Sequence, residues 1–201
     1  MKNVITVPGM SLPVETHEFE TAIHEAAHAV LAHRFNSQIR SVTIEPCGSN
    51  DGSASTDPDP DVDADSVDAY FAVQKEVIAL LAGAEAVRQF REQYCPVRMN
   101  EPYGDESDKA TARNLLVHSA ILFAEEPVEV GMQRLQEVTA VAAGGVFAQI
   151  HILARHLLDR RALSGEQVVA ILDDITREDA VQLEATATVS AVSQNRPGRV
   201  E

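Results

Sequence analysis

Two histidines stand four residues apart, with a glutamate directly after the first, in the stretch TAIHEAAH at residues 21–28. On a helix, side chains four residues apart project from one face, so the imidazoles of His24 and His28 can reach the same metal ion. Glu25 lies at the edge of that face, where it can accept a proton from an activated water. The spacing therefore predicts a metal-dependent hydrolytic site, with zinc as the favoured ion.

Chance is the alternative explanation for this pattern. In a chain with 7 histidines among 201 residues, a His-Glu-x-x-His sequence arises by accident in roughly 2% of cases. A catalytic zinc also needs a third protein ligand and an open fourth position. Several residues could supply the third ligand by spacing alone: Glu85, Asp105, Asp108, His118 and His151.

The motif needs a helix to position it, and the surrounding sequence predicts one over residues 16–34. Apolar residues recur there at helical spacing. Thr16 is expected to cap the helix, and Glu18 and Glu20 suit its positive N-terminal end. Two ligands from this one helix would then face the rest of the domain together.

A small β element is expected beside this helix. Residues 39–45 alternate apolar and polar and are rich in β-branched side chains, which predicts a strand. If its edge is free, the strand could align an extended peptide by β-addition. Residues 47–65 are rich in aspartate and turn residues, which predicts an acidic surface loop with a short strand at 52–56.

The remaining pattern is helical. Helices are expected over residues 66–92, from 105 or 107 to 124, over 127–161 with a bend at Gly144-Gly145, and over 164–175, where Ser164 and Gln167 have capping-box spacing. The predicted fold is therefore mostly α, with one to three short strands beside the zinc-binding helix. Residues 1–15 form an N-terminal arm, 16–175 the domain, and 176–201 a flexible tail.

Composition restricts the function further. The chain is 45% hydrophobic but only 4% aromatic, which favours packed helices, and its formal net charge of −15 argues against binding nucleic acid or an anionic membrane. Cys47 and Cys95 are too few for a disulfide framework. There is no secretory signal and no apolar run long enough for a membrane span. A cytoplasmic location is the expectation.

Several stretches, in order along the chain, resemble the peptidase domain of the FtsH family of ATP-dependent zinc metalloproteases. TAIHEAAHAVLA resembles the family's zinc-binding helix, written HEAGHA, and SVTIEPCG resembles the strand and turn that follow. VIALLAGAEAV resembles a helix with the signature LLGGRAAE. GDESDKATARNLL resembles the segment that supplies the third ligand, and HLLDRRALSGEQVVAIL resembles the closing helix pair. The matches span about residues 17–175.

The resemblance implies roles for particular residues. His24 and His28 would bind zinc, and Glu25 would be the general base. Asp108 would be the third ligand because Ala112 then lies four residues on, a spacing that Asp105 fits worse. A helix N-cap would also explain Asp108.

A supporting role is implied for a further acidic residue. Glu85 matches an acidic position of the family and would support the site from behind the ligands. A salt bridge on the helix surface is the alternative role of Glu85.

The chain also departs from the family. It contains no ATPase module and no GxxxxGK[ST] phosphate loop, so we expect ATP-independent zinc-dependent hydrolysis of peptides or unfolded proteins. The family's hexamers imply that a homo-oligomer is possible. Two alternatives stay open: a non-catalytic, zinc-containing binding or regulatory protein on the same scaffold, and a selective protease that cuts a single partner.

Overall fold

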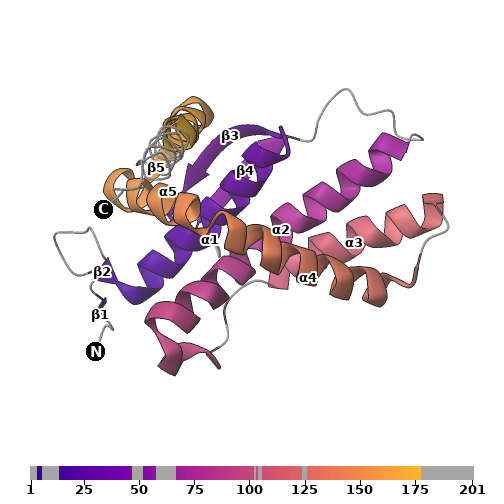
Figure 1. The fold of residues 1–201 in the computed structure, drawn as a ribbon, viewed down its shortest axis with the longest axis horizontal. Coiled ribbons are helices and arrows are strands. Elements are labelled where there is room, and N and C mark those ends of the chain that lie inside the picture. The colour runs from indigo at the N-terminus through magenta and orange to yellow at the C-terminus, as the bar shows by residue number, and fades with distance from the viewer. Residues whose placement is uncertain are drawn as a thin grey trace, which may run out of the picture.

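The computed structural model describes residues 4–5, 14–46, 52–57, 67–101, 103, 106–123 and 126–177. Within them the fold is mostly helical with a small antiparallel sheet, as the sequence predicts (Figure 1). The α-helices are α1 (Thr16–Arg34), α2 (Val67–Tyr94), α3 (Glu106–Phe123), α4 (Val128–Gly145) and α5 (Phe147–Arg160), and residues 165–177 are also helical. A short 3₁₀ helix, η1 (Pro96–Arg98), follows α2.

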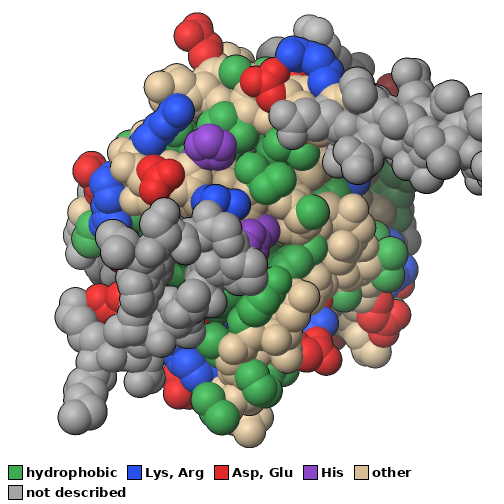
Figure 2. All heavy atoms as spheres, turned by 60° about the vertical axis from the view of Figure 1, so that its left-hand side comes forward, with side chains coloured by type: hydrophobic (Ala, Val, Ile, Leu, Met, Phe, Trp, Pro, Cys, Tyr) green, Lys and Arg blue, Asp and Glu red, His purple; other side chains and the backbone are tan. Residues whose placement is uncertain are grey.

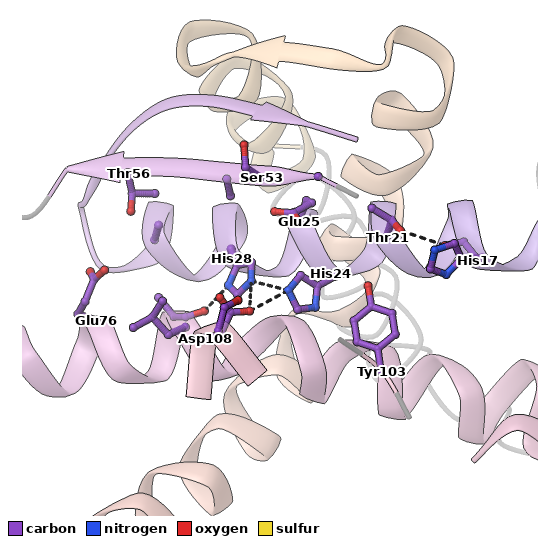
Figure 3. A pocket seen from close by; sticks show the side chains of 16 residues that line it. His17, Thr21, His24, Glu25, His28, Ser53, Thr56, Glu76, Tyr103 and Asp108 are labelled. Carbon is purple, nitrogen blue, oxygen red and sulfur yellow. Dashed lines mark hydrogen bonds and ion pairs between the residues drawn. The ribbon is translucent and has the colours of Figure 1, made fainter. Parts of the chain in front are cut away.

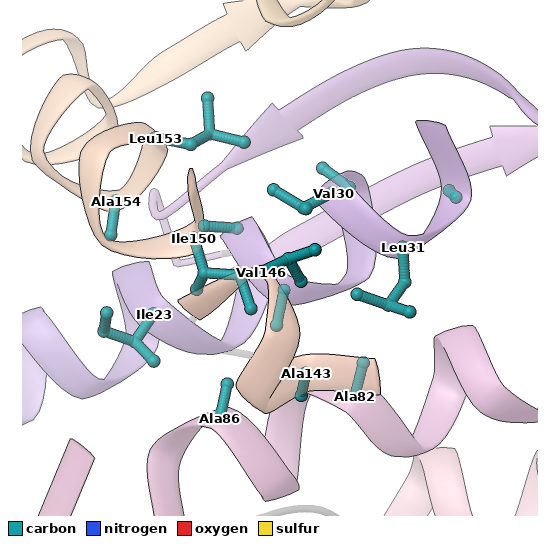
Figure 4. Close-up of a cluster of buried hydrophobic side chains, with 14 of the residues drawn as sticks. Ile23, Val30, Leu31, Ala82, Ala86, Ala143, Val146, Ile150, Leu153 and Ala154 are labelled. Carbon is teal, nitrogen blue, oxygen red and sulfur yellow. The ribbon is translucent and has the colours of Figure 1, made fainter. Parts of the chain in front are cut away.

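Helix α1 is the centre of the domain, and its predicted bounds are confirmed. Every residue from Phe19 to Ala27 is buried, because α2, α5, the sheet and part of α4 surround the helix. Ile23, Val30 and Leu31 of α1 lie in the core (Figure 4). They meet small side chains on α2 and α4, including Ala82 and Ala143, which let the helices approach closely.

A buried ion pair fixes α1 against α2. The Glu20 carboxylate, which has no exposed surface, accepts hydrogen bonds from Arg91 at 2.9 and 3.1 Å. Arg98 of η1 lies 3.2 Å from the same carboxylate. Glu20 was expected to suit the positive N-terminal end of the helix; in the structure it is buried, and its charge joins α1, α2 and η1.

The sheet has the order β4-β3-β5, with all pairs antiparallel. Its strands are β3 (Gln38–Thr43), β4 (Ser53–Asp57) and β5 (Ala162–Ser164). Val42 of β3 pairs with Ala54 on one side and with Leu163 on the other. A free edge, the condition under which the strand at 39–45 could align a peptide, is therefore not met, and β4 is an outer strand instead. The pairing with β5 comes from distant sequence, which local patterns do not reveal.

Two details of the helix ends test the sequence rules. Thr16 is not the N-cap of α1: Glu15 holds that position and no side chain caps the helix. Thr16 is buried as the first helical residue. The capping box is confirmed by two hydrogen bonds. The Gln167 side-chain oxygen accepts from the Ser164 backbone N–H at 2.9 Å, and the Gln167 backbone N–H donates to the Ser164 hydroxyl at 3.3 Å.

The predicted helix over 127–161 is two helices. α4 ends at Gly145, and α5 leaves at an angle of 73° after Val146. Among the described helices, none alone has the length and hydropathy to cross a membrane, whereas the bent α4–α5 pair passes that test by length and composition.

The ends of the chain are described in part. β1 (Val4–Ile5) pairs with β2 (Val14–Glu15) in the predicted arm. The helix over 165–177 passes the predicted end at 175, and residues 178–201 lie outside the described part, as does the predicted acidic loop apart from 52–57. On the face in Figure 2, the described acidic and basic side chains are interspersed with hydrophobic ones.

Candidate metal centre

Three side chains from α1 and α3 converge on one point (Figure 3). His24 Nε2 lies 2.9 Å from His28 Nε2 and 3.0 Å from Asp108 Oδ2, and His28 Nε2 lies 3.5 Å from the same oxygen. The two histidines come from successive turns of α1, whereas Asp108 comes from the first turn of α3. These three atoms form the one group of described residues that could hold a metal ion.

The triangle fits a zinc ion. Zinc bonds of 2.0–2.1 Å at tetrahedral angles place neighbouring ligand atoms roughly 3.3 Å apart, and the observed separations of 2.9 to 3.5 Å bracket that value. Two imidazoles and one carboxylate are also a donor set that catalytic zinc sites use. With three protein ligands, a tetrahedral ion would keep one position for water or substrate.

The backbone of α2 orients one ligand. The Nδ1 atom of His28 lies 2.7 Å from the carbonyl oxygen of Ala79, so Nδ1–H donates to this oxygen. In the neutral form of His28, the Nε2 lone pair would then be directed at the point that His24 and Asp108 share. Histidine ligands are commonly held in this way by a hydrogen bond to the other ring nitrogen.

The neighbours of His24 leave its ring little freedom. A Cβ atom on Gly83 of α2 would lie 2.5 Å from the imidazole. On another side, the Tyr103 ring lies 5.2 Å from the His24 ring, centroid to centroid, and its hydroxyl donates to the Glu20 carbonyl at 3.3 Å. Gly83 thus provides space for the ligand, and Tyr103 bounds it.

The charges of the ligands are complementary. Burial by itself raises the pKa of Asp108, but hydrogen bonds from His24 and His28 outweigh it and hold that pKa well below its usual range. Burial lowers the pKa of His28, yet the hydrogen bond with Asp108 and the charge of Glu25 reverse the effect and leave the pKa raised. Without a metal, the cluster therefore favours an ionised Asp108 beside a proton on the imidazoles.

Glu25 lines the same cavity as the three ligands. This cavity, about 270 Å³ in volume, lies between α1, α2, the start of α3 and the strand β4. Burial raises the pKa of Glu25 to about 7, against the opposing attraction of His28. A Cβ atom on Gly52 would lie 2.9 Å from Glu25 Cγ, so a small residue before β4 makes space for the glutamate.

Glu85, another candidate ligand, does not reach this point. Glu85 accepts hydrogen bonds from Arg88 at 2.7 and 2.9 Å and from Gln89 at 2.8 Å, and it does not line the cavity. Its contacts are those of a surface ion pair. Asp105 and Cys47 lie outside the described residues, and Cys95 is a buried free thiol.

Two histidines are also excluded by position. His118 is exposed, and its Nδ1 lies 2.7 Å from the Asn114 carbonyl one turn earlier. His151 packs edge-on against Phe19 at 5.4 Å, on another side of α1. The sequence pattern included both as possible ligands, because spacing along the chain does not show which helix faces meet.

Several residues of the cavity could not be recognised from the sequence. Gly83 of α2 is one of them in effect, because a Cβ atom there would meet the His24 ring of α1. Glu76 of α2 and Thr56 of β4 also line the cavity and carry no motif of their own. Glu76 lies three and four residues before Ala79 and Leu80, so the three residues share one face of α2. That shared face was the only signal in the sequence that could have connected Glu76 with the cavity.

Comparison with models of protein families finds none that matches this chain, and comparison with curated proteins finds no similar sequence. The resemblance to the FtsH peptidase domain therefore stays a prediction from the motifs.

Proposed function

We propose that this protein is a zinc-dependent peptide hydrolase, with the ion held by His24, His28 and Asp108. The observation that carries the proposal is the convergence of their three ligand atoms within 3.5 Å, with the Glu25 carboxyl group in the same cavity. A site that only stabilised the fold would normally be closed by a fourth protein ligand. A cavity beside three ligands instead favours access for substrate.

Zinc, when bound there, supplies a Lewis acid that polarises the scissile carbonyl and makes water more acidic. Glu25 then acts as the general base: its carboxylate accepts the proton of the attacking water and returns it to the leaving amine. The Glu25 carboxyl group lies in the same cavity as the three candidate ligands, where it can serve first as the base and then as the acid. No step requires a nucleotide.

The cavity favours a peptide as the substrate. β4 lies along it, with Ser53, Ala54 and Thr56 in the wall, and β4 has one sheet partner, β3, among the described strands. An extended backbone could therefore pair with β4 and pass the metal centre. This moves the expected β-addition from the strand at 39–45 to β4. Unfolded segments are the natural source of such a chain.

The test combines metal content with cleavage. Protein purified without a histidine tag and supplied with zinc should hold about one ion per chain by mass spectrometry. His24→Ala should lose the ion and Asp108→Ala should hold it more weakly. Glu25→Gln should keep it but stop cleavage of fluorescein-labelled unfolded casein.

Two results would contradict the proposal. A wild-type protein that remains metal-free in excess zinc would show that the two histidines merely pack together. A zinc-loaded wild-type protein that cleaves neither casein nor a peptide mixture would favour the non-catalytic alternative, in which Glu25→Gln changes nothing.

A further inference from the structure

One carboxylate in the cavity has no place in the proposed chemistry. Glu76 projects from α2 near the end of the cavity opposite His17 and Tyr103, with the metal ligands between them (Figure 3). Across that end, Thr56 points down from β4 (Figure 3). Glu76 is not one of the three candidate metal ligands, so metal binding does not account for a carboxyl group at this end of the cavity.

The positive charge that acts on the Glu76 carboxyl group within the cavity is that of His28, and no lysine or arginine lies beside it in the described part of the lining. None of the ion pairs found in the described part of the chain includes Glu76. The nearest cation in sequence, Lys75, is exposed one position earlier on α2. The segments that flank β4 in the chain add no positive charge, because no lysine or arginine occurs between Arg40 and Lys75.

The cavity that Glu76 lines also has apolar groups in its wall. Leu80 lies one turn after Glu76 on α2, and Ala79 of α2 and Ala32 of α1 line the same cavity. These apolar groups could cover a methylene stem while the Glu76 carboxylate and the Thr56 hydroxyl bind its polar end. Lysine and arginine have this combination of apolar stem and cationic head.

We propose that Glu76 forms a specificity subsite for a lysine or arginine side chain of the substrate peptide. The inference rests on the proposed peptide hydrolysis, since it assigns one end of the same cavity. A partly buried carboxylate favours a cation over a neutral side chain and repels an acidic one. The subsite would give this acidic protein a preference for basic unfolded segments.

Binding tests the subsite apart from catalysis. The probes are short fluorescein-labelled alanine-serine peptides with one central lysine, norleucine or glutamate, and the protein is zinc-loaded Glu25→Gln. Fluorescence anisotropy at physiological salt should show the lysine peptide binding about tenfold more tightly than the norleucine peptide. Adding Glu76→Gln should bring this ratio close to one, and Glu76→Lys should favour the glutamate peptide.

Asp68→Asn is the matched control, because Asp68 is an exposed acid at the start of the same helix. It should keep the lysine preference, whereas an equal loss in this variant would mean that the overall negative charge attracts the peptide. If Glu76→Gln left the ratio of affinities for the lysine and norleucine peptides unchanged, the proposed subsite would be wrong. Circular dichroism of each variant shows whether the fold is kept.

Cleavage gives the second readout. A mixture of unfolded peptides cut by the wild type should show lysine or arginine enriched at one position beside the cut bond, and Glu76→Gln should remove that enrichment. Cutting without any basic preference would overturn the subsite and leave the proposed hydrolysis intact. Absence of cutting together with selective lysine binding would overturn the hydrolysis and leave the cation site.

Discussion

Gly83 and His24 occupy adjoining space between α2 and α1: a Cβ atom at residue 83 would lie 2.5 Å from the His24 ring. No side-chain carbon tolerates such a separation, so a larger residue would displace the imidazole or part the helices. The position of His24 in the candidate metal centre therefore depends on Gly83, which supplies no ligand atom itself. A glycine in the middle of a helix destabilises the helix by about 0.5–1 kcal/mol relative to alanine. The space that the His24 ring needs explains why α2 has a glycine at this position.

Gly83→Ala should weaken zinc binding by about fivefold or more, because overpacking of this kind costs about 1–3 kcal/mol. Competition with a chromophoric chelator measures the affinity. Gly144→Ala is the control, since a Cβ atom on Gly144 of α4 would meet only Gln89 at an ordinary 3.7 Å. It should bind zinc normally and be slightly more stable. Unchanged affinity in Gly83→Ala would show that the ring can move without loss.

Zinc should stabilise the folded protein. Ligand that binds only the native state adds about 2.7 kcal/mol at one hundred times its Kd, so the thermal midpoint of the wild type should rise on zinc addition and fall on chelation. His28→Ala should show no such rise. Magnesium is the ion control, because it prefers oxygen ligands in an octahedral site. An equal rise with both ions would argue against a site defined by two imidazoles.

Glu20→Ala should destabilise the domain by about 3–5 kcal/mol, because it leaves the Arg91 guanidinium buried without its counter-charge. Urea denaturation measures this change. The control is Glu129→Ala, which breaks an exposed pair with Arg113 and should leave stability within error. A small loss in Glu20→Ala would mean that water or a neighbouring carbonyl replaces the carboxylate.

His151 should make the protein acid-sensitive. Burial lowers its pKa, with Arg155 adding to the effect, and its Nε2 is buried with no hydrogen-bond partner among the described residues. The folded state therefore binds the proton more weakly than the unfolded state. The resulting stability is present above the unfolded pKa of about 6.5 and is lost as the pH falls below it.

His151→Phe removes this titration and suits the aromatic contacts with Phe19 and Phe147. Its unfolding free energy should therefore fall less than that of the wild type between about pH 7.5 and about pH 5.5. Parallel urea titrations at each pH provide the comparison. Equal pH slopes for the two proteins would show that His151 is accessible to protons in the folded state.

Local sequence patterns predicted the features that depend on residues close together along the chain. Helical spacing gave the bounds of α1 and placed His24 and His28 on one face, and the Ser164–Gln167 spacing gave the capping box. Such patterns are read within one or two turns, because a helix repeats its faces every 3.6 residues. They also predicted a mostly helical fold.

Tertiary structure decided the features that join distant residues. It brought Asp108 to His24 across 84 positions and paired β3 on both sides. It also placed Glu76 in the cavity. The sequence around an isolated acidic residue on a helix does not show which other helix the residue will contact, because this contact depends on how entire helix faces pack together. The motif predicted two ligands of the candidate metal centre, and packing brought the third candidate, Asp108, to them.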